Sequence, residues 1–196
     1  VLEEEPGDHG ARQLLSGLTG KEDRFWEEWA PDLEELRTQS PPRGKWPRSD
    51  RVCLFDQTVT RIYPDTSSVD VVHQVWRLLD ERGTQELSRR PTAGETLAIR
   101  TIRPDGSVYE PIRANTGEFR MPGLTPGALV EHSFRRREGA AGFQYSNGPF
   151  YFMDPGLAEP FWLSRWVLLI HEDAPVTVIE RNLRRRGMKH TQTKRG

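Results

Sequence analysis

Apolar and polar residues alternate along most of the chain after residue 51, with the period of two that β-strands show. This alternation predicts one long strand over Val52–Tyr63 and a second over Val69–Leu79. The segment PDTSS between them has turn chemistry, because Pro64 presets φ and Asp65 and the serines can bond to their own backbone. The two strands are therefore predicted to form a β-hairpin.

The second strand of this hairpin is apolar on both faces. One face carries Val69, Val71, His73 and Val75, and the other carries Val72, Trp76 and Leu78. A strand that is apolar on both sides must be covered on both sides. We expect the second sheet of a sandwich to cover one face, and the N-terminal helical segment is the candidate cover for the other.

Further strands and turn signals follow the hairpin. The strands predicted by the pattern are two short ones around Pro104-Asp105-Gly106, one over Ala128–Arg137 after the Pro/Gly loop Met121–Gly127, a short one in FYFM (150–153), a central one over Phe161–His171, and a last one over Pro175–Arg181. Strands and turns without alternating helices indicate a mainly β, antiparallel sandwich.

The chain before the hairpin is predicted to hold only short helical structure. Residues 1–20 are polar and contain glycine, which favours poor order. Trp26, Trp29, Leu33 and Leu36 then recur at helical spacing, and Pro31 interrupts them, so the segment is one kinked helix or two short ones. We divide the chain into an acidic tail, a helical segment and a Pro-rich linker over 1–48, a β-sandwich domain over 49–183, and a basic tail or linker over 184–196.

Composition sets limits on this picture. The 196 residues carry a net charge of -1, which gives no overall attraction to nucleic acid or to an anionic membrane. No run of ~18 apolar residues exists, so we expect no membrane insertion. The single cysteine, Cys53, excludes an internal disulfide. The chain starts at Val1, and we expect it to be a segment cut from a longer protein.

The basic end of the chain, RNLRRRGMKHTQTKRG, has two interpretations. It could contact the phosphate groups of nucleic acid or of anionic lipid. It lacks interleaved aromatic residues that would stack on bases, and charge runs are usually solvated tails. We favour a solvated connector into the next domain and predict no nucleic-acid partner.

No catalytic constellation emerges from the motifs. Cys53 lies among apolar strand neighbours, so a buried side chain is favoured over a nucleophile, which would need a base and a lowered pKa. Glu131-His132 and His171-Glu172-Asp173 contain metal-ligand types, but neither has a second ligand at a specific spacing. No Gly-x-Ser-x-Gly motif is present. We therefore predict a non-enzymatic segment without a metal or a cofactor.

Aromatic residues supply one candidate binding surface. Tyr145, Trp162 and Trp166 could form a platform for a sugar or a peptide, because planar rings offer large contact area at low entropic cost. The competing interpretation is core packing, which is the more frequent role of a tryptophan at strand spacing. Exposure of these side chains distinguishes the two interpretations.

Four segments within residues 51–182 carry a family resemblance: VTRIYPDTSSVDVVHQVWRLLDERG, IRTIRPDGSVYEP, MPGLTPGALVEHSFRRR and SRWVLLIHEDAPVTVIERN. In this order they resemble an uncharacterised β-sandwich domain that precedes a transglutaminase-like domain in many exported bacterial proteins. The chain departs from the family at Thr66, where the first hairpin turn usually has glycine, so this turn is expected to differ.

The resemblance implies an immunoglobulin-like sandwich in a multidomain bacterial protein that is periplasmic or secreted. In such proteins a papain-type Cys-His-Asp domain often follows the sandwich, and helical repeats sometimes precede it. The family's domain has no established activity, so no catalytic residue carries over to this chain.

These observations lead to competing functional hypotheses. The first is a non-catalytic accessory module of a larger transglutaminase-like protein, which contacts adjoining domains of the same polypeptide through its end loops Pro104–Gly106, Met121–Gly127 and Gly139–Gly148. The second is a ligand-binding domain that acts alone through its aromatic platform. A third, weaker hypothesis is an enzyme that uses Cys53, and it requires an accessible thiol.

Overall fold

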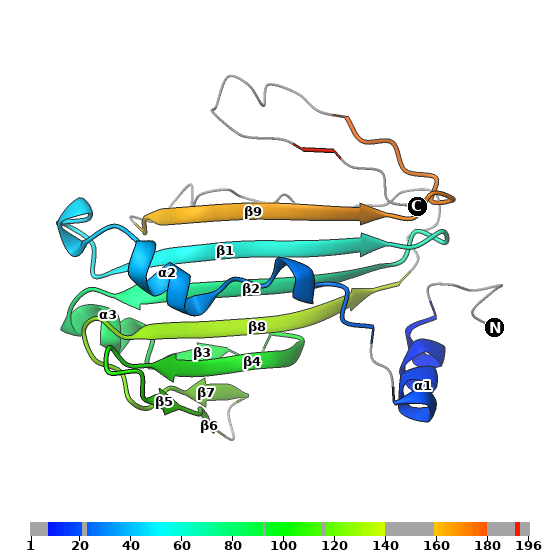
Figure 1. The fold of residues 1–196 in the computed structure, drawn as a ribbon. Coiled ribbons are helices and arrows are strands. Elements are labelled where there is room, and N and C mark those ends of the chain that lie inside the picture. The colour runs from blue at the N-terminus through cyan, green and yellow to red at the C-terminus, as the bar shows by residue number, and fades with distance from the viewer. Residues whose placement is uncertain are drawn as a thin grey trace.

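Two β-sheets and a few short helices build the protein (Figure 1). The structure is a computed structural model that describes residues 8–20, 23–91, 93–114, 117–139, 159–179 and 191–192. A six-stranded sheet has the order β5-β4-β8-β2-β1-β9, and a three-stranded sheet has the order β3-β7-β6. The strands are β1 (Arg51–Ile62), β2 (Ser68–Leu78), β3 (Arg89–Pro91), β4 (Glu95–Ile102), β5 (Val108–Tyr109), β6 (Ile112–Arg113), β7 (Glu118–Arg120), β8 (Leu129–Glu138) and β9 (Phe161–Ile170).

Antiparallel pairing dominates both sheets, and the single parallel pair in the described chain is β1 with β9. The helices are α1 (His9–Thr19), η1 (Glu27–Trp29), α2 (Leu33–Gln39), η2 (Arg43–Lys45) and α3 (Glu81–Glu86). The predicted mainly β fold with few helices is therefore confirmed. No helix of the described residues is long and apolar enough to cross a membrane.

The predicted hairpin is formed by β1 and β2, whose register closes at Ile62 opposite Ser68. Asp65 organises the turn, because its Oδ1 accepts hydrogen bonds from the backbone N–H of Ser67 at 3.1 Å and from its hydroxyl at 2.7 Å. Thr66 adopts a left-handed conformation with φ 68. A β-branched residue is unfavourable in this region of φ, and glycine is the residue that adopts it without strain.

We expect Thr66→Gly to stabilise the protein by about 1 kcal/mol, because it removes the left-handed strain at the centre of the turn. Urea unfolding at constant m-value measures the change. Gly106→Ala is the matched control, since Gly106 has φ 85 in the corresponding turn between β4 and β5, and this reverse change should destabilise. A Thr66→Gly protein less stable than the parent would contradict the prediction.

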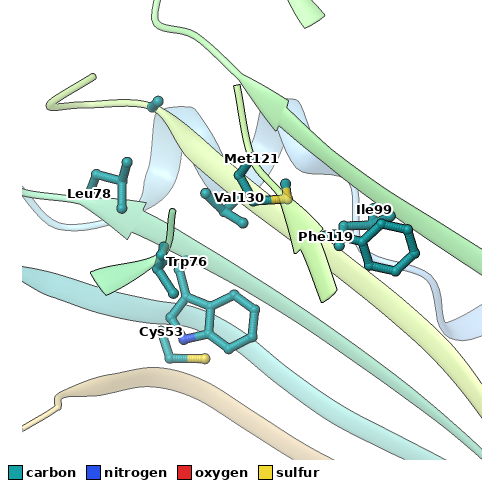
Figure 2. Close-up of a cluster of buried hydrophobic side chains, with 9 residues drawn as sticks. Cys53, Trp76, Leu78, Ile99, Phe119, Met121 and Val130 are labelled. Carbon is teal, nitrogen blue, oxygen red and sulfur yellow. The ribbon is translucent and has the colours of Figure 1, made fainter. Parts of the chain in front are cut away.

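One face of the hairpin packs against the three-stranded sheet. Trp76 and Leu78 of β2 and Val130 of β8 meet Phe119 of β7 and the adjacent Met121 in one buried cluster (Figure 2). This is the inter-sheet core that the apolar pattern of the second hairpin strand predicts.

The other face is covered by the N-terminal helices, which run across β1, β2 and β8 (Figure 1). Leu36 of α2 and Trp46 after η2 are buried against Val75 of β2 and Leu129 of β8. The backbone carbonyl of Trp29 accepts hydrogen bonds from the side chains of Gln57 of β1, at 3.2 Å, and Arg165 of β9, at 2.7 Å. We name residues 23–46, which these bonds anchor to the sheet, the strap. The N-terminal cover predicted for this face is confirmed.

The strap contains two short helices in place of one kinked helix. Pro31 lies between η1 and α2, and the side chain of Asp32 caps α2 by accepting hydrogen bonds from the N–H groups of Glu34 and Glu35. Because proline has no N–H and aspartate is a favoured N-cap, this dipeptide ends one helical turn and starts the next helix. Of the two alternatives left open by the spacing, the second is correct.

Three further segments differ from the prediction. The region 1–20, expected to be poorly ordered, contains α1. The side chain of Asp8 caps the first turn of this helix by accepting a hydrogen bond from the backbone N–H of Ala11. Strand β9 ends the strand order and is not central. Residues 175–179 contain no strand, and the remainder of the predicted last strand, like FYFM, lies outside the described residues. Apolarity alone does not rank strands, because an edge strand can be apolar where it packs on one neighbour.

Candidate functional site

The predicted aromatic platform is not one surface. Trp162 is half-buried against the cluster that contains Leu36 of α2, so it contacts the strap side of the sheet. Trp166 is 38% exposed, and its indole Nε1 donates to the hydroxyl of Thr60 at 3.0 Å. Tyr145 lies outside the described residues.

Trp166 faces away from the strap. The hydroxyl of Thr60 donates in turn to Asp70 Oδ1 at 2.6 Å. Asp70 lies on β2 between Val69 and Val71, which pack towards Phe25 and Trp26 of the strap, so alternation along the strand directs Asp70 to the opposite face. The indoles of Trp162 and Trp166 are thus separated by the sheet.

Two of the predicted contact loops meet at one end of the molecule. The guanidinium of Arg103, before the Pro104–Gly106 turn, donates from Nε to the carbonyl of Gly123 at 2.9 Å and stacks on Tyr109. Gly123 has φ +73, and a side chain there would meet the Tyr109 ring at 2.5 Å, so glycine is required at this contact. Of the third loop, Gly139–Gly148, only Gly139 is described.

Exposed apolar residues lie beside these two loops. Val108 of β5 is 51% exposed and Ile112 of β6 is 60% exposed, and only Glu110 and Pro111 separate the two short strands. We name Val108, Ile112 and the loops Pro104–Gly106 and Met121–Gly127 the loop-end surface. It combines a rigid backbone with uncovered aliphatic side chains.

Cys53 lies inside the inter-sheet core and is fully buried. Burial raises the pKa of its thiol well above the usual value, with a further contribution from the negative charges of Asp56 and Glu159. The thiolate is the reactive form of cysteine, so this environment suppresses nucleophilic chemistry. The thiol donates weakly to the carbonyl of Phe55 at 3.4 Å, in keeping with a small buried side chain.

Glu131 and His132, a candidate ligand pair by sequence, point to opposite faces of β8. Glu131 is buried on the strap side, where it pairs with Arg100 and where its Oε1 lies 2.9 Å from His73 Nε2. Burial alone would raise the pKa of Glu131, but the hydrogen bond and charge of His73 and the charge of Arg100 outweigh it and lower the pKa. These contacts bind strands β2, β4 and β8 together.

His132 is a buried histidine without a hydrogen-bond partner. It is 1% exposed, and neither ring nitrogen has a partner, although its ring contacts Phe134 at 5.0 Å. Burial, with help from the charges of Arg90 and His73, lowers its pKa to about 4. The side chain is therefore neutral in the folded state near neutral pH, and its protonation under acid would cost stability.

His171 lies just after β9, half-exposed, and its Nδ1 accepts a hydrogen bond from the backbone N–H of Asp173 at 3.2 Å. This contact is local turn structure. Within the part of the chain that the structure describes, no three His, Cys, Asp or Glu side chains gather at a position that could hold a metal ion.

A pocket lies between α1 and one end of the six-stranded sheet, and we name it the α1 pocket. Arg12 and Leu15 of α1 line one side, and Tyr63, Val69 and Arg135 of the sheet line the other. Sequence reasoning missed this pocket, because the polar, glycine-containing residues 1–20 were expected to be poorly ordered. The Asp8 N-cap and Gly20, which ends the helix with φ 64, are the local signals that indicate α1.

Comparison with known proteins leaves the family of this chain open. No protein-family model and no curated protein matches it. Among solved structures, the chain is similar to the crystal structure of a "putative protease" from Parabacteroides distasonis, with 9% sequence identity and a TM-score of 0.38. The similarity covers 47% of this chain and 24% of that one, so the chain spans about a quarter of the protein it matches.

Proposed function

We propose that this chain is a non-catalytic accessory domain that contacts an adjoining domain through the loop-end surface. The observation that carries the proposal is the exposure of Val108 and Ile112 beside two loops that are fixed to each other by Arg103, Tyr109 and Gly123. A preformed apolar patch on a rigid backbone loses little conformational entropy when it is covered.

The remaining chemistry of the described residues supports a scaffold role. The thiol of Cys53 is buried with a raised pKa, and Glu131 is held by Arg100 and His73. Resemblance to the family supplies the finer proposal: an immunoglobulin-like sandwich in a bacterial protein outside the cytoplasm, next to a transglutaminase-like domain of the same polypeptide. The partner of the loop-end surface would then be that domain.

Hydrogen exchange on the complete parent protein tests the proposal. We expect the amides of residues 104–113 and 121–127 to exchange more slowly in the parent than in the 196-residue chain, and the double change Val108→Ser with Ile112→Ser to abolish this protection. Leu18→Ser, which alters a still more exposed aliphatic residue on α1, is the matched control and should leave protection unchanged.

Two results would overturn the proposal. One is a reading frame that stops directly after the codon for Gly196. The other is an identical exchange rate at the loop-end surface in the parent and in the isolated chain. The alternative function, an aromatic platform of Tyr145, Trp162 and Trp166, gains no support from the separation of the two tryptophans across the sheet.

A further inference from the structure

The α1 pocket has the size of a small-molecule site. Its volume is about 710 Å³, and ligand pockets typically measure roughly 300–1,000 Å³. Helix α1 contacts the sheet through its first turn, where His9 Nε2 lies 3.1 Å from the carbonyl of Glu138 at the end of β8. Leu15, one and a half turns further along, lines the pocket and remains 48% exposed. The pocket is therefore bounded by the described chain but not filled by it.

Arg12 supplies a positive charge that no carboxylate of the described residues pairs with. Its guanidinium carbon lies 3.5 Å from the centroid of the Tyr63 ring, so the ring fixes the plane of the group. Its Nε is buried without a hydrogen-bond partner, and Arg12 forms no ion pair with any residue of the described ranges. An oriented guanidinium presents two terminal nitrogens in the geometry that matches a carboxylate.

The other two arginines that line the pocket already pair with a carboxylate. Arg135 and Arg137 both pair with Glu95, at 2.7 and 2.6 Å. Asp23 pairs with Arg61 of β1. Arg12 is thus the arginine of the lining that pairs with no carboxylate of the described residues, so it is the group that an anionic ligand would meet.

We propose that the α1 pocket binds a ligand with one carboxylate and an apolar body. The carboxylate pairs with Arg12, and the body lies against Leu15, Phe25 and Val69, which line the same pocket. A free hydrophobic acid and the C-terminus of a peptide share this chemistry.

Calorimetric titration of the full chain with N-acetyl-L-phenylalanine tests the proposal, and N-acetyl-L-phenylalaninamide is the uncharged control ligand. We expect the acid to bind and the amide to bind at least about tenfold more weakly, as the loss of a charged hydrogen bond predicts. A tripeptide that ends in phenylalanine identifies the source: tighter binding than the free acid indicates a peptide C-terminus, and equal binding indicates a small acid.

Variants locate the binding in the pocket. Arg12→Gln should weaken binding of the acid about tenfold, whereas Arg43→Gln, which removes an exposed arginine that pairs with Asp80, should leave it unchanged. Leu15→Asp keeps the contact of Arg12 with Tyr63 and places a competing carboxylate in the pocket, so it should also reduce binding. Absence of binding at millimolar acid, equal binding of acid and amide, or full binding by Leu15→Asp would overturn the proposal.

Discussion

Replacement of Trp76 by alanine should destabilise the protein by about 3–5 kcal/mol, the cost expected for loss of a large buried aromatic side chain. Trp76 is 5% exposed and lies at the centre of the core between the two sheets, against Cys53 (Figure 2). The guanidinium of Arg90 of β3 lies 4.2 Å from its ring. Burial already lowers the pKa of Arg90, so loss of the ring leaves a poorly solvated cation beside a cavity.

Guanidinium chloride unfolding of the two proteins measures this difference. Trp166→Ala is the matched control, because it removes the same side chain from a position that is 38% exposed and donates a hydrogen bond to Thr60. We expect that control to lose no more than about 2 kcal/mol. Equal losses in the two variants would mean that the inter-sheet core does not dominate the stability.

Acid should destabilise the protein through His132, which is buried and neutral in the folded state. The pKa of this histidine is lowered from 6.5 to about 4 by burial and by the charges of Arg90 and His73. The unfolded chain therefore takes up a proton near its ordinary pKa, and the folded chain does not take it up until about pH 4. The contribution of His132 to the free energy of unfolding is fully present above the pKa of the unfolded chain and is lost as the pH falls towards the pKa of the folded chain. The loss is about 2 kcal/mol between about pH 7.5 and about pH 5.

The change His132→Leu should remove this part of the pH dependence. At neutral pH the variant should be as stable as the parent or more stable, because it eliminates two buried nitrogens that have no hydrogen-bond partner. His171→Leu removes a half-exposed histidine and should keep the pH dependence of the parent. Unfolding free energies of the three proteins across this pH range provide the comparison. The same slope in the parent and in His132→Leu would refute the assignment.

Periodicity could predict the strands whose two faces pack against different parts of the protein. In β2, Val75 packs under α2 and Trp76 packs against the small sheet, so each face needed apolar residues and the sequence showed both. The position of β9 could not be predicted in this way. Its apolar residues satisfy contacts to β1, but strand order depends on which distant segments pair, and a pattern within one strand holds no such information.

The candidate sites were less predictable, because they depend on side-chain direction in three dimensions. The register of β1 shifts between Cys53 and Phe55, so a count of alternate residues assigns the wrong face on one side of the shift. The α1 pocket joins Arg12 to Tyr63, two residues that share no local pattern. By contrast, the two loops that meet at Gly123 could be found from turn chemistry, because glycine and proline mark them directly.

The strap carries a consequence for the order of events during synthesis. The carbonyl of Trp29 is bound by Gln57 and by Arg165, and the latter lies 136 residues further along the chain. A ribosome releases the strap first and β9 much later. For most of the synthesis the nascent chain can therefore form the bond from Gln57 to Trp29 but not the bond from Arg165. Pairing at such separation closes slowly, because the entropy of a long loop is lost before its contacts form. The apolar underside of the strap is therefore most exposed to protease and chaperone in the interval before β9 arrives.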